Sequence, residues 1–206
     1  MLKVGITGSI GTGKTLASNF FKEKGYTVLD ADLINQALLK DEKVIQEINH
    51  KLFDLDSKAL DKKKVRELIF SNPKKKEVLE SILHPIIYIK MEEALKKLEH
   101  EAIVFLDVPL LFEAEFDQLT DYNLVIFASK DHQIDRLIKR DSITKQEALL
   151  RIKAHFDIRQ KMRLGDYVIN NDESVENTLE QLNQWLENFK KVGQRFINRK
   201  KFEKYI

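Results

Sequence analysis

Residues 8–15 form a glycine-rich segment whose residue types and spacing suit the binding of phosphate. The segment reads Gly-Ser-Ile-Gly-Thr-Gly-Lys-Thr and follows the short apolar run 2–6. Its three glycines allow positive φ angles, so successive backbone N–H groups can point at one anion. Lys14 adds a positive charge toward the outer phosphates, and the hydroxyl of Thr15 is a ligand that Mg²⁺ accepts. The pattern predicts binding of a nucleoside triphosphate, rather than a glycine turn without chemical consequence.

Carboxylates follow the second and third apolar runs of the chain. The second run ends in Asp30-Ala31-Asp32, and the third ends at Asp107. In a parallel sheet the carboxyl ends of the strands line the ligand crevice, where a carboxylate can accept a proton or help to hold Mg²⁺. Asp32 is preferred for proton transfer, because the alternation of a strand directs it toward the crevice. The alternatives are that Asp30 or Asp32 only caps a helix, and that Asp107 only begins a turn before Pro109.

Two arginines farther along the chain are candidates for the stabilisation of phosphate charge. Arg136 and Arg140 are four residues apart in a predicted helix, so they share one face of it. Further basic residues, including Arg151 and Lys153, follow in a charged stretch. An arginine-bearing lid would stabilise the charge that spreads on a phosphoryl group during transfer. Charged helix faces are more often simply solvated, and this is the preferred interpretation for Arg151 and Lys153. For Arg140 the preference is reversed only by a family resemblance.

Five short apolar runs must position these side chains. They are rich in β-branched or aromatic residues, as expected for a parallel sheet covered on both faces. The runs are Leu2–Ile6, Tyr26–Leu29, Ala102–Leu106, Tyr122–Ala128 and Tyr167–Ile169. A helix is expected from Thr15 to Lys24, with Gly25 as its C-terminal stop. The segment 33–100 has apolar residues at helical spacing and no strand signal, which predicts an inserted helical lobe.

Composition sets broad limits on the kind of protein. The 206 residues include no cysteine, which excludes disulfides, thiolate metal sites and a cysteine nucleophile. Thirty-five Lys and Arg against 33 Asp and Glu give a formal charge of +2, which does not call for a nucleic-acid partner. No apolar stretch is long enough for a membrane span, and an apolar strand at residue 2 leaves no room for a signal peptide. We therefore expect a cytoplasmic protein, and a solvated extension for the basic segment 190–206.

Several motifs, in this order and at these spacings, resemble the dephospho-CoA kinase family from residue 1 to about residue 185. They are Thr7-Gly8-Ser9-Ile10-Gly11-Thr12-Gly13-Lys14-Thr15, Asp30-Ala31-Asp32, Leu83-His84-Pro85, Asp107-Val108-Pro109-Leu110-Leu111-Phe112-Glu113, Arg136 through Asp141, and Asp166-Tyr167-Val168-Ile169-Asn170-Asn171. The resemblance implies ATP-dependent phosphorylation of the ribose 3′-hydroxyl of dephospho-CoA, with ATP, dephospho-CoA and Mg²⁺ as ligands. Two departures from the family pattern are His155 in place of a commoner Gln, and Asp172-Glu173 in place of a glycine after Asn171.

The resemblance also implies roles for individual residues. The catalytic residues would be Asp32 as general base, Lys14 and Arg140, with Thr15 and Asp107 as the metal site. ATP binding is assigned to Gly8, Gly11, Thr12, Gly13, Lys14, Thr15, Leu16, Arg140 and Asn171. Acceptor binding is assigned to Asp32, Arg66, His84, Tyr88, Leu110 and Glu113. Without the resemblance, His84 before Pro85 would be read as a structural residue at the start of a helix.

Two other classes of function are weighed against this one. A GTP-binding switch needs a guanine-reading N/T-K-x-D motif, which Ser129-Lys130-Asp131 matches poorly. A kinase of another small acceptor, such as a nucleoside monophosphate, would use the same loop and differ in the lobe. We expect a three-layer α/β P-loop kinase with a five-stranded, mostly parallel sheet, working as a monomer or small homo-oligomer. Its parts would be a core of 1–32 and 101–190, an acceptor lobe of 33–100, a lid of 136–163 and the tail 190–206.

Overall fold

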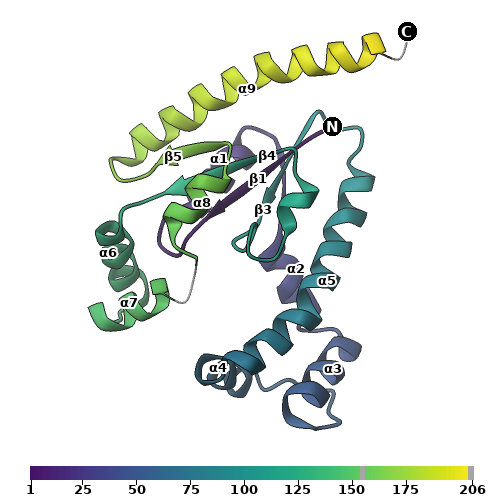
Figure 1. Ribbon diagram of the computed structural model, residues 1–206, viewed down its shortest axis with the longest axis vertical. Helices are drawn as coiled ribbons and strands as arrows, with labels where there is room; N and C mark the ends of the chain where they lie inside the picture. Colours follow the sequence, from purple (N-terminus) through teal and green to yellow (C-terminus); the bar gives the residue numbers. More distant parts are fainter. Residues whose placement is uncertain (154–155, 204–206) are drawn as a thin grey trace. The chain divides into compact units, whose positions relative to one another are not determined.

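The computed structural model describes residues 1–153 and 156–203, the last twelve of these by their backbone alone. Figure 1 shows an α/β architecture in which helices alternate with the strands of one sheet. The elements are β1 (Leu2–Gly8), α1 (Lys14–Glu23), β2 (Thr27–Asp30), α2 (Ala31–Leu38), α3 (Glu42–Phe53), α4 (Lys62–Ser71), α5 (Pro73–Lys97), β3 (Ile103–Asp107), the 3₁₀ turn η1 (Phe116–Leu119), β4 (Tyr122–Phe127), α6 (Lys130–Asp141), α7 (Lys145–Lys153), α8 (Ile158–Leu164), β5 (Tyr167–Asn170) and α9 (Val175–Glu203). The chain divides into two compact units, Met1–Val28 with Glu101–Ile206, and Leu29–His100.

The sheet has the strand order β2-β3-β1-β4-β5. The central strand β1 pairs in parallel with β3 on one side and β4 on the other, and β4 pairs in parallel with β5. After β1, the next two strands of the chain, β2 and β3, lie on one side of β1, and the last two, β4 and β5, lie on the other side. The carboxyl end of β1 is therefore a topological switch point, which is where ligands bind in open α/β sheets.

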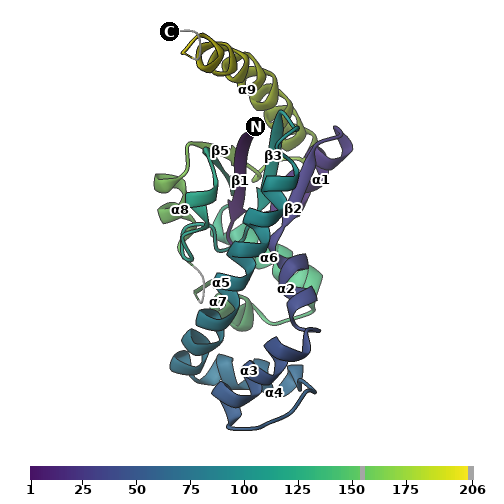
Figure 2. The same cartoon turned by 90° about the vertical axis from the view of Figure 1, so that its right-hand side faces the viewer.

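Helices cover both faces of the sheet, as Figures 1 and 2 show. On one face α1 and α9 pack on alternate residues of the strands, with Phe21, Phe105 and Trp185 at the centre of that core. On the other face α8 packs against β4 and β1, close enough that a Cβ on Gly165 would overlap the side chain of Val125. The sheet is buried on both faces, which explains why its strands read as short apolar runs.

The unit Leu29–His100 consists of helices around the long helix α5. Its helices begin at side-chain caps, because Asp30, Asp41, Asp61 and Asn72 each accept a hydrogen bond from a backbone N–H of the first turn. The segment after α3 is held by Asn49, whose side chain donates to the carbonyl oxygens of residues 57 and 59. This unit therefore has its own caps and its own buried apolar residues.

The sequence predicted the elements of the fold well. All five predicted strands are present, each with its ends within two residues of the predicted ones, and α1 ends before Gly25, which has a φ of 84°. The predicted lid 136–163 contains two residues, 154 and His155, that lie outside the described residues, as do the last three residues of the predicted tail.

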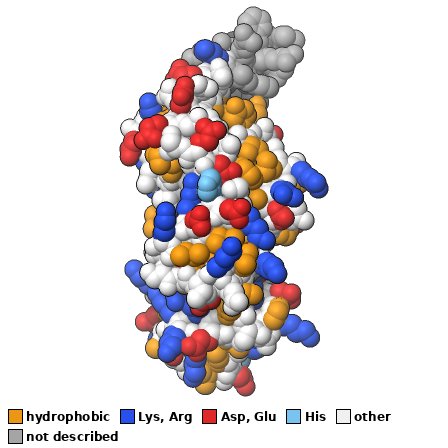
Figure 3. Space-filling view, turned by 90° about the vertical axis from the view of Figure 1, so that its left-hand side faces the viewer, with side chains coloured by type: hydrophobic (Ala, Val, Ile, Leu, Met, Phe, Trp, Pro, Cys, Tyr) orange, Lys and Arg blue, Asp and Glu red, His pale blue; other side chains and the backbone are white. Residues whose placement is uncertain are grey.

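On the face drawn in Figure 3, acidic and basic side chains are interspersed. Among the described residues, no helix has the length and apolar character needed to cross a membrane.

Candidate active site

The glycine-rich loop lies at the switch point and has a backbone that requires its glycines. The loop leaves β1 at Gly8 and enters α1 at Lys14. Gly11 and Gly13 have φ angles of 79° and 90°, in the region that side-chain-bearing residues rarely adopt. A Cβ on Gly11 would lie 2.9 Å from the carbonyl oxygen of Gln133, and one on Gly13 would overlap the amide group of Asn171. The two glycines therefore allow both the loop conformation and the close approach of neighbouring segments.

Two side chains from outside the loop brace its backbone. Arg136 of α6 donates from Nη1 to the carbonyl oxygens of Gly11 and Thr12, both at 3.3 Å, and from Nη2 to the carbonyl oxygen of Asn171 at 2.6 Å. The side chain of Asn171, which is 4% exposed, donates to the same Thr12 carbonyl at 2.8 Å and accepts from Thr178 at 2.8 Å. Because these hydrogen bonds hold the carbonyl groups of Gly11 and Thr12, they restrain the backbone conformation of the loop.

Lys14 and Asp107 form the charged centre of the loop. The ammonium of Lys14 makes a short contact with Oδ1 of Asp107, and the hydroxyl of Ser18 donates to Oδ2 at 2.5 Å. Asp107 is 4% exposed, so its charge is stabilised by these two donors rather than by water. The interpretation of Asp107 as only a strand-end turn does not account for this pairing, which joins the end of β3 to the start of α1.

The residues assigned to Mg²⁺ have the ligand chemistry that this ion prefers. Thr15 is exposed at the first turn of α1, directly after Lys14, and Asp107 supplies a carboxylate that contacts Lys14. Mg²⁺ takes oxygen ligands and is held by one or two protein groups together with substrate phosphates. The pair therefore fits the ion. Leu16 follows in the same turn, and its N–H donates to the carbonyl of Gly13 at 2.9 Å.

Arg140 lies one turn beyond Arg136 on α6 and has different partners. Its guanidinium donates to both oxygens of Asp141, at 2.7 and 3.0 Å, and Arg151 of α7 donates to the same carboxylate at 2.5 Å. The hydrogen bond from Arg140 is the main cause that lowers the pKa of Asp141. The side chain of Arg140 is 60% exposed, so it is accessible to a ligand from solvent. Arg151, read from the sequence as a solvated charge, joins α7 to the end of α6.

Asp30 and Asp32 have separate structural roles. Asp30 is the N-cap of α2, because its Oδ1 accepts from the N–H groups of Asp32 and Leu33 at 2.9 and 3.2 Å. Asp32 is the second residue of the helix and is exposed. The capping interpretation therefore applies to Asp30, and the carboxylate of Asp32 is not the cap of α2.

The acceptor residues predicted from the sequence occur in both units. Arg66 of α4 lies with Glu67, Phe70 and Ser71 along a shallow, open depression in the helical unit. His84 and Tyr88 are four residues apart in α5, and burial lowers the pKa of His84 against an opposing effect of Glu80. The interpretation of His84 as a helix-start residue is wrong, because α5 begins at Pro73 and continues through Pro85.

Leu110 and Glu113 belong to the other unit, in the segment that follows β3. Leu110 is half-buried, and its carbonyl accepts from the N–H of Ala114 at 3.1 Å. The carboxylate of Glu113 forms an ion pair with Lys161 of α8, with 2.8 Å between Oε1 and Nζ. The segment therefore carries one half-buried apolar side chain and one carboxylate that is fixed by a charge.

Sequence reasoning missed two positions next to the loop. Arg136 was treated as the companion of Arg140, although its own contacts are to the loop backbone. Lys161 was not considered, and it is 1% exposed, a condition that lysine tolerates only with a partner. Burial lowers the pKa of Lys161, the contact with Glu113 raises it, and the positive charge of Lys14 lowers it further. The alternation of charged and apolar residues around Lys161 gives no local signal of its burial.

The chain is similar to known proteins over most of its length. The family model for dephospho-CoA kinase matches residues 2–177. A dephospho-CoA kinase of Carboxydothermus hydrogenoformans is 34% identical over 194 residues, covering 91% of this chain and 94% of the relative. Another from Enterococcus faecalis is 34% identical over 197 residues, covering 91% of this chain and 97% of the relative.

Solved structures share the fold. TT1252 from Thermus thermophilus has a TM-score of 0.75 at 29% identity, covering 91% of this chain and 97% of that chain. A shikimate kinase from Bacteroides thetaiotaomicron has a TM-score of 0.55 at 19% identity, covering 90% and 98%, a likeness of fold alone. The expected α/β P-loop kinase fold is confirmed. Because the family model matches residues 2–177 and a named relative is 34% identical over 91% of the chain, the chain belongs to the dephospho-CoA kinase family.

Proposed function

We propose that this chain transfers the γ-phosphoryl group of ATP to the ribose 3′-hydroxyl of dephospho-CoA, giving CoA and ADP in the last step of coenzyme A synthesis. The observation that carries the proposal is the braced loop, with Lys14 at its end, in a member of this family. Loop N–H groups and a lysine in fixed positions bind phosphate without reorganisation, which is the main contribution of a protein to phosphoryl transfer.

The reaction assigns one task to each proposed catalytic residue. A bond forms between the acceptor oxygen and the γ-phosphorus, and the bond from that phosphorus to the bridging oxygen of ADP breaks. Asp32 accepts the proton of the attacking hydroxyl, and Arg140 stabilises the charge on the phosphoryl oxygens. Lys14 has three donors, so its ammonium can keep Asp107 as a partner while it binds phosphate. Asn171 contributes to ATP binding indirectly, because its side chain donates to the carbonyl of Thr12 and so helps to fix the loop.

Mg²⁺, when bound, supplies charge neutralisation to the phosphates, and Thr15 and Asp107 are the residues that would hold it. The acceptor residues Arg66, His84, Tyr88, Leu110 and Glu113 would hold the parts of dephospho-CoA remote from the reacting hydroxyl. Binding energy from such remote parts can be used to orient the hydroxyl, so a truncated acceptor should lower kcat as well as raise KM.

The test is a coupled assay of ADP release with dephospho-CoA, adenosine, AMP, UMP and CMP as acceptors, followed by mass spectrometry of the product. We expect clear turnover with dephospho-CoA and far poorer turnover with the others. Lys14→Ala is the matched control for contaminating kinases and should abolish turnover. Equal or better rates with AMP, UMP or CMP would overturn the proposal in favour of a nucleoside monophosphate kinase.

We propose a cytoplasmic location, since ATP is supplied there, and a monomer or small homo-oligomer without nucleic-acid or membrane partners. Light scattering after gel filtration, with and without ATP and dephospho-CoA, measures the oligomeric state directly. A large assembly under these conditions would contradict this part of the proposal.

A further inference from the structure

Lys161 is a buried lysine that is hydrogen-bonded to the residue before the phosphate-binding loop and has no role in the proposed reaction. Its side chain is 1% exposed and belongs to α8, which packs on β4 and β1. Burial of an ammonium is costly unless the charge is paired and its donors are satisfied. A position that retains such a group therefore needs partners, and the partners indicate what the group does.

The ammonium of Lys161 has three oxygen partners, from two separate segments. Nζ lies 2.8 Å from Oε1 of Glu113 and donates to the carbonyl oxygen of Pro109 at 2.5 Å. A longer hydrogen bond of 3.4 Å goes to the hydroxyl of Thr7, which itself donates to the Pro109 carbonyl at 3.1 Å. Thr7 directly precedes the phosphate-binding loop. Lys161 thus joins α8, the end of β1 and both ends of the segment 109–113.

Both carboxylate oxygens of Glu113 are buried and receive no hydrogen bond in the described part of the chain, and Oε1 makes the ion pair with Lys161. The charge of Lys161 compensates Oε1 at 2.8 Å, whereas Oε2 has no donor among the described residues. A buried, charged oxygen without a donor is unfavourable, and in native proteins such an oxygen is generally paired with water or a ligand. The side chain of Glu113 as a whole is 14% exposed, so it reaches the surface of the unit.

We propose that Lys161 is a positioning residue for the acceptor: it holds Glu113 ionised and in place, so that Oε2 accepts a hydrogen bond from a hydroxyl or N–H group of the acceptor. Lys161 is too deeply buried to contact the acceptor itself and acts through Glu113. This inference rests on the proposed function, because it requires an acceptor bound at the segment 109–113. The alternative is a structural role, in which the cluster only fixes α8 to the sheet.

The test compares Lys161→Met, Glu113→Gln and the double variant in steady-state kinetics with each substrate varied in turn. Loss of a hydrogen bond to a charged group predicts a KM for dephospho-CoA raised on the order of 10- to 100-fold in each single variant. The KM for ATP should stay within about twofold, since the loop itself is unchanged. The double variant should be no worse than Glu113→Gln, because Lys161 acts only through Glu113.

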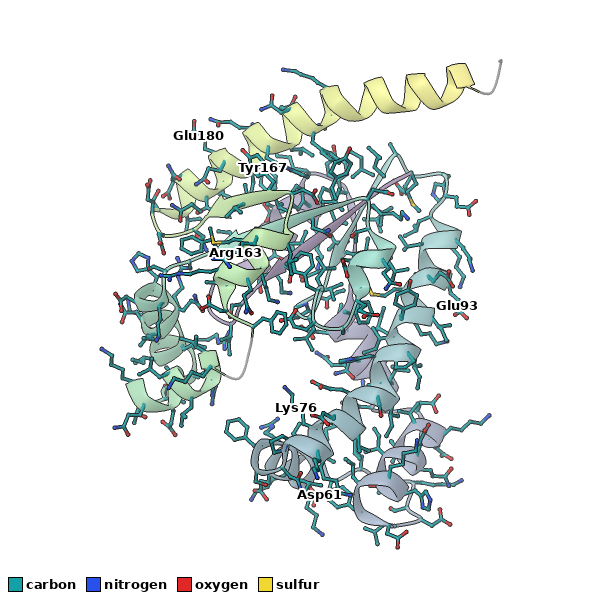
Figure 4. The ribbon with its side chains drawn as sticks, in the orientation of Figure 1. Asp61, Lys76, Glu93, Arg163, Tyr167 and Glu180 are labelled. Atoms are coloured by element: carbon teal, nitrogen blue, oxygen red, sulfur yellow. The ribbon has the colours of Figure 1, made fainter. Side chains whose placement is uncertain are left out.

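The matched control is Arg163→Met, since Arg163 is an exposed cation on the same helix and is labelled in Figure 4. It should match the wild type in both KM values. Each single variant leaves one charge buried without its partner and risks misfolding, whereas the double variant buries no charge. The double variant, checked for folding by circular dichroism, therefore decides the test. An acceptor KM equal to that of the wild type, or an equal rise in both KM values, would overturn the inference.

Failure of the proposed function is separable from failure of this inference. Wild-type turnover with dephospho-CoA is measured first, and its absence counts against the function alone. If another acceptor is phosphorylated, the same four variants are compared with that acceptor. A selective rise in its KM would support the role of Lys161 on the acceptor side, and its absence would contradict that role.

Discussion

Replacement of Arg136 by methionine should weaken ATP binding, although Arg136 is not expected to touch the nucleotide. The substitution keeps most of the apolar stem and removes the guanidinium, which donates to carbonyl oxygens of Gly11, Thr12 and Asn171. The carbonyls of Gly11 and Thr12 then lose a restraint on the loop, and the loop can adopt other conformations. ATP binding must first restore the original conformation, so the cost of restoring it appears in the measured affinity.

The contact distances set the size of the effect. A hydrogen bond from a charged donor contributes about 1.5–3 kcal/mol when its geometry is good. The bond to Asn171 at 2.6 Å is of this kind, and it acts on the loop through the side chain of Asn171, which donates to the carbonyl of Thr12. The two bonds at 3.3 Å share one nitrogen and together add less. A total of about 2–3 kcal/mol corresponds to a dissociation constant for ATP that is about 30- to 150-fold higher.

Isothermal titration of the variant with ATP and Mg²⁺ measures this change, and urea unfolding checks that the variant is folded. Arg140→Met is the informative comparison, because Arg140 bonds to Asp141 and not to the loop. In Arg140→Met, the fold decrease in kcat should exceed the fold increase in the dissociation constant for ATP. A folded Arg136→Met variant that binds ATP within about twofold of the wild type would refute the view that this arginine braces the loop.

Two further predictions concern the helical unit. Asp32→Asn should lower kcat by about 10²- to 10⁴-fold in acceptor-saturated assays, as expected for loss of a general base. Because Asp30 is the cap of α2, this variant should keep its thermal stability, and a large drop in stability with normal kcat would contradict the role. Burial lowers the pKa of His84, so the unfolded chain binds a proton more readily than the native protein and stability falls as the pH drops below 6.5. Urea titrations at several pH values measure this loss of stability, which His84→Gln should reduce. The control His50→Gln should not reduce it, because the side chain of His50 is 73% exposed. Equal dependence of stability on pH in the wild type and His84→Gln would contradict the role of His84.

The sequence was sufficient for the fold because the strands are buried on both faces and therefore read as apolar runs. It was sufficient for the loop because the glycines at 11 and 13 are required by backbone angles that few other residues adopt. It was less informative about the helical unit, where Pro85 suggested a helix boundary inside what is one helix, α5. A single proline can be tolerated there because the rest of the helix keeps its packing and hydrogen bonds.

The residues around the loop could not be distinguished by sequence, for a physical reason. Arg136 and Arg140 have the same local environment in a helical pattern, yet one contacts the loop and the other a carboxylate in its own helix. Lys161 appears as one more charge in a basic stretch, and its burial depends on Glu113 and Pro109 from a distant part of the chain. Charge pairing between distant segments is a property of the folded chain, and no local pattern specifies it.

The aromatic cluster between α1, β3 and α9 gives this protein a built-in optical reporter. Trp185 is the only tryptophan in the chain and is 7% exposed, stacked on Phe189 with 4.7 Å between ring centroids. Its fluorescence therefore reports on the unit that contains the sheet, whereas far-ultraviolet circular dichroism also records the helices of residues 29–100. Melting curves from the two signals would coincide if both units unfold together and would separate if one melts first. A single native chromophore is thus enough to measure the cooperativity of the two units without labels.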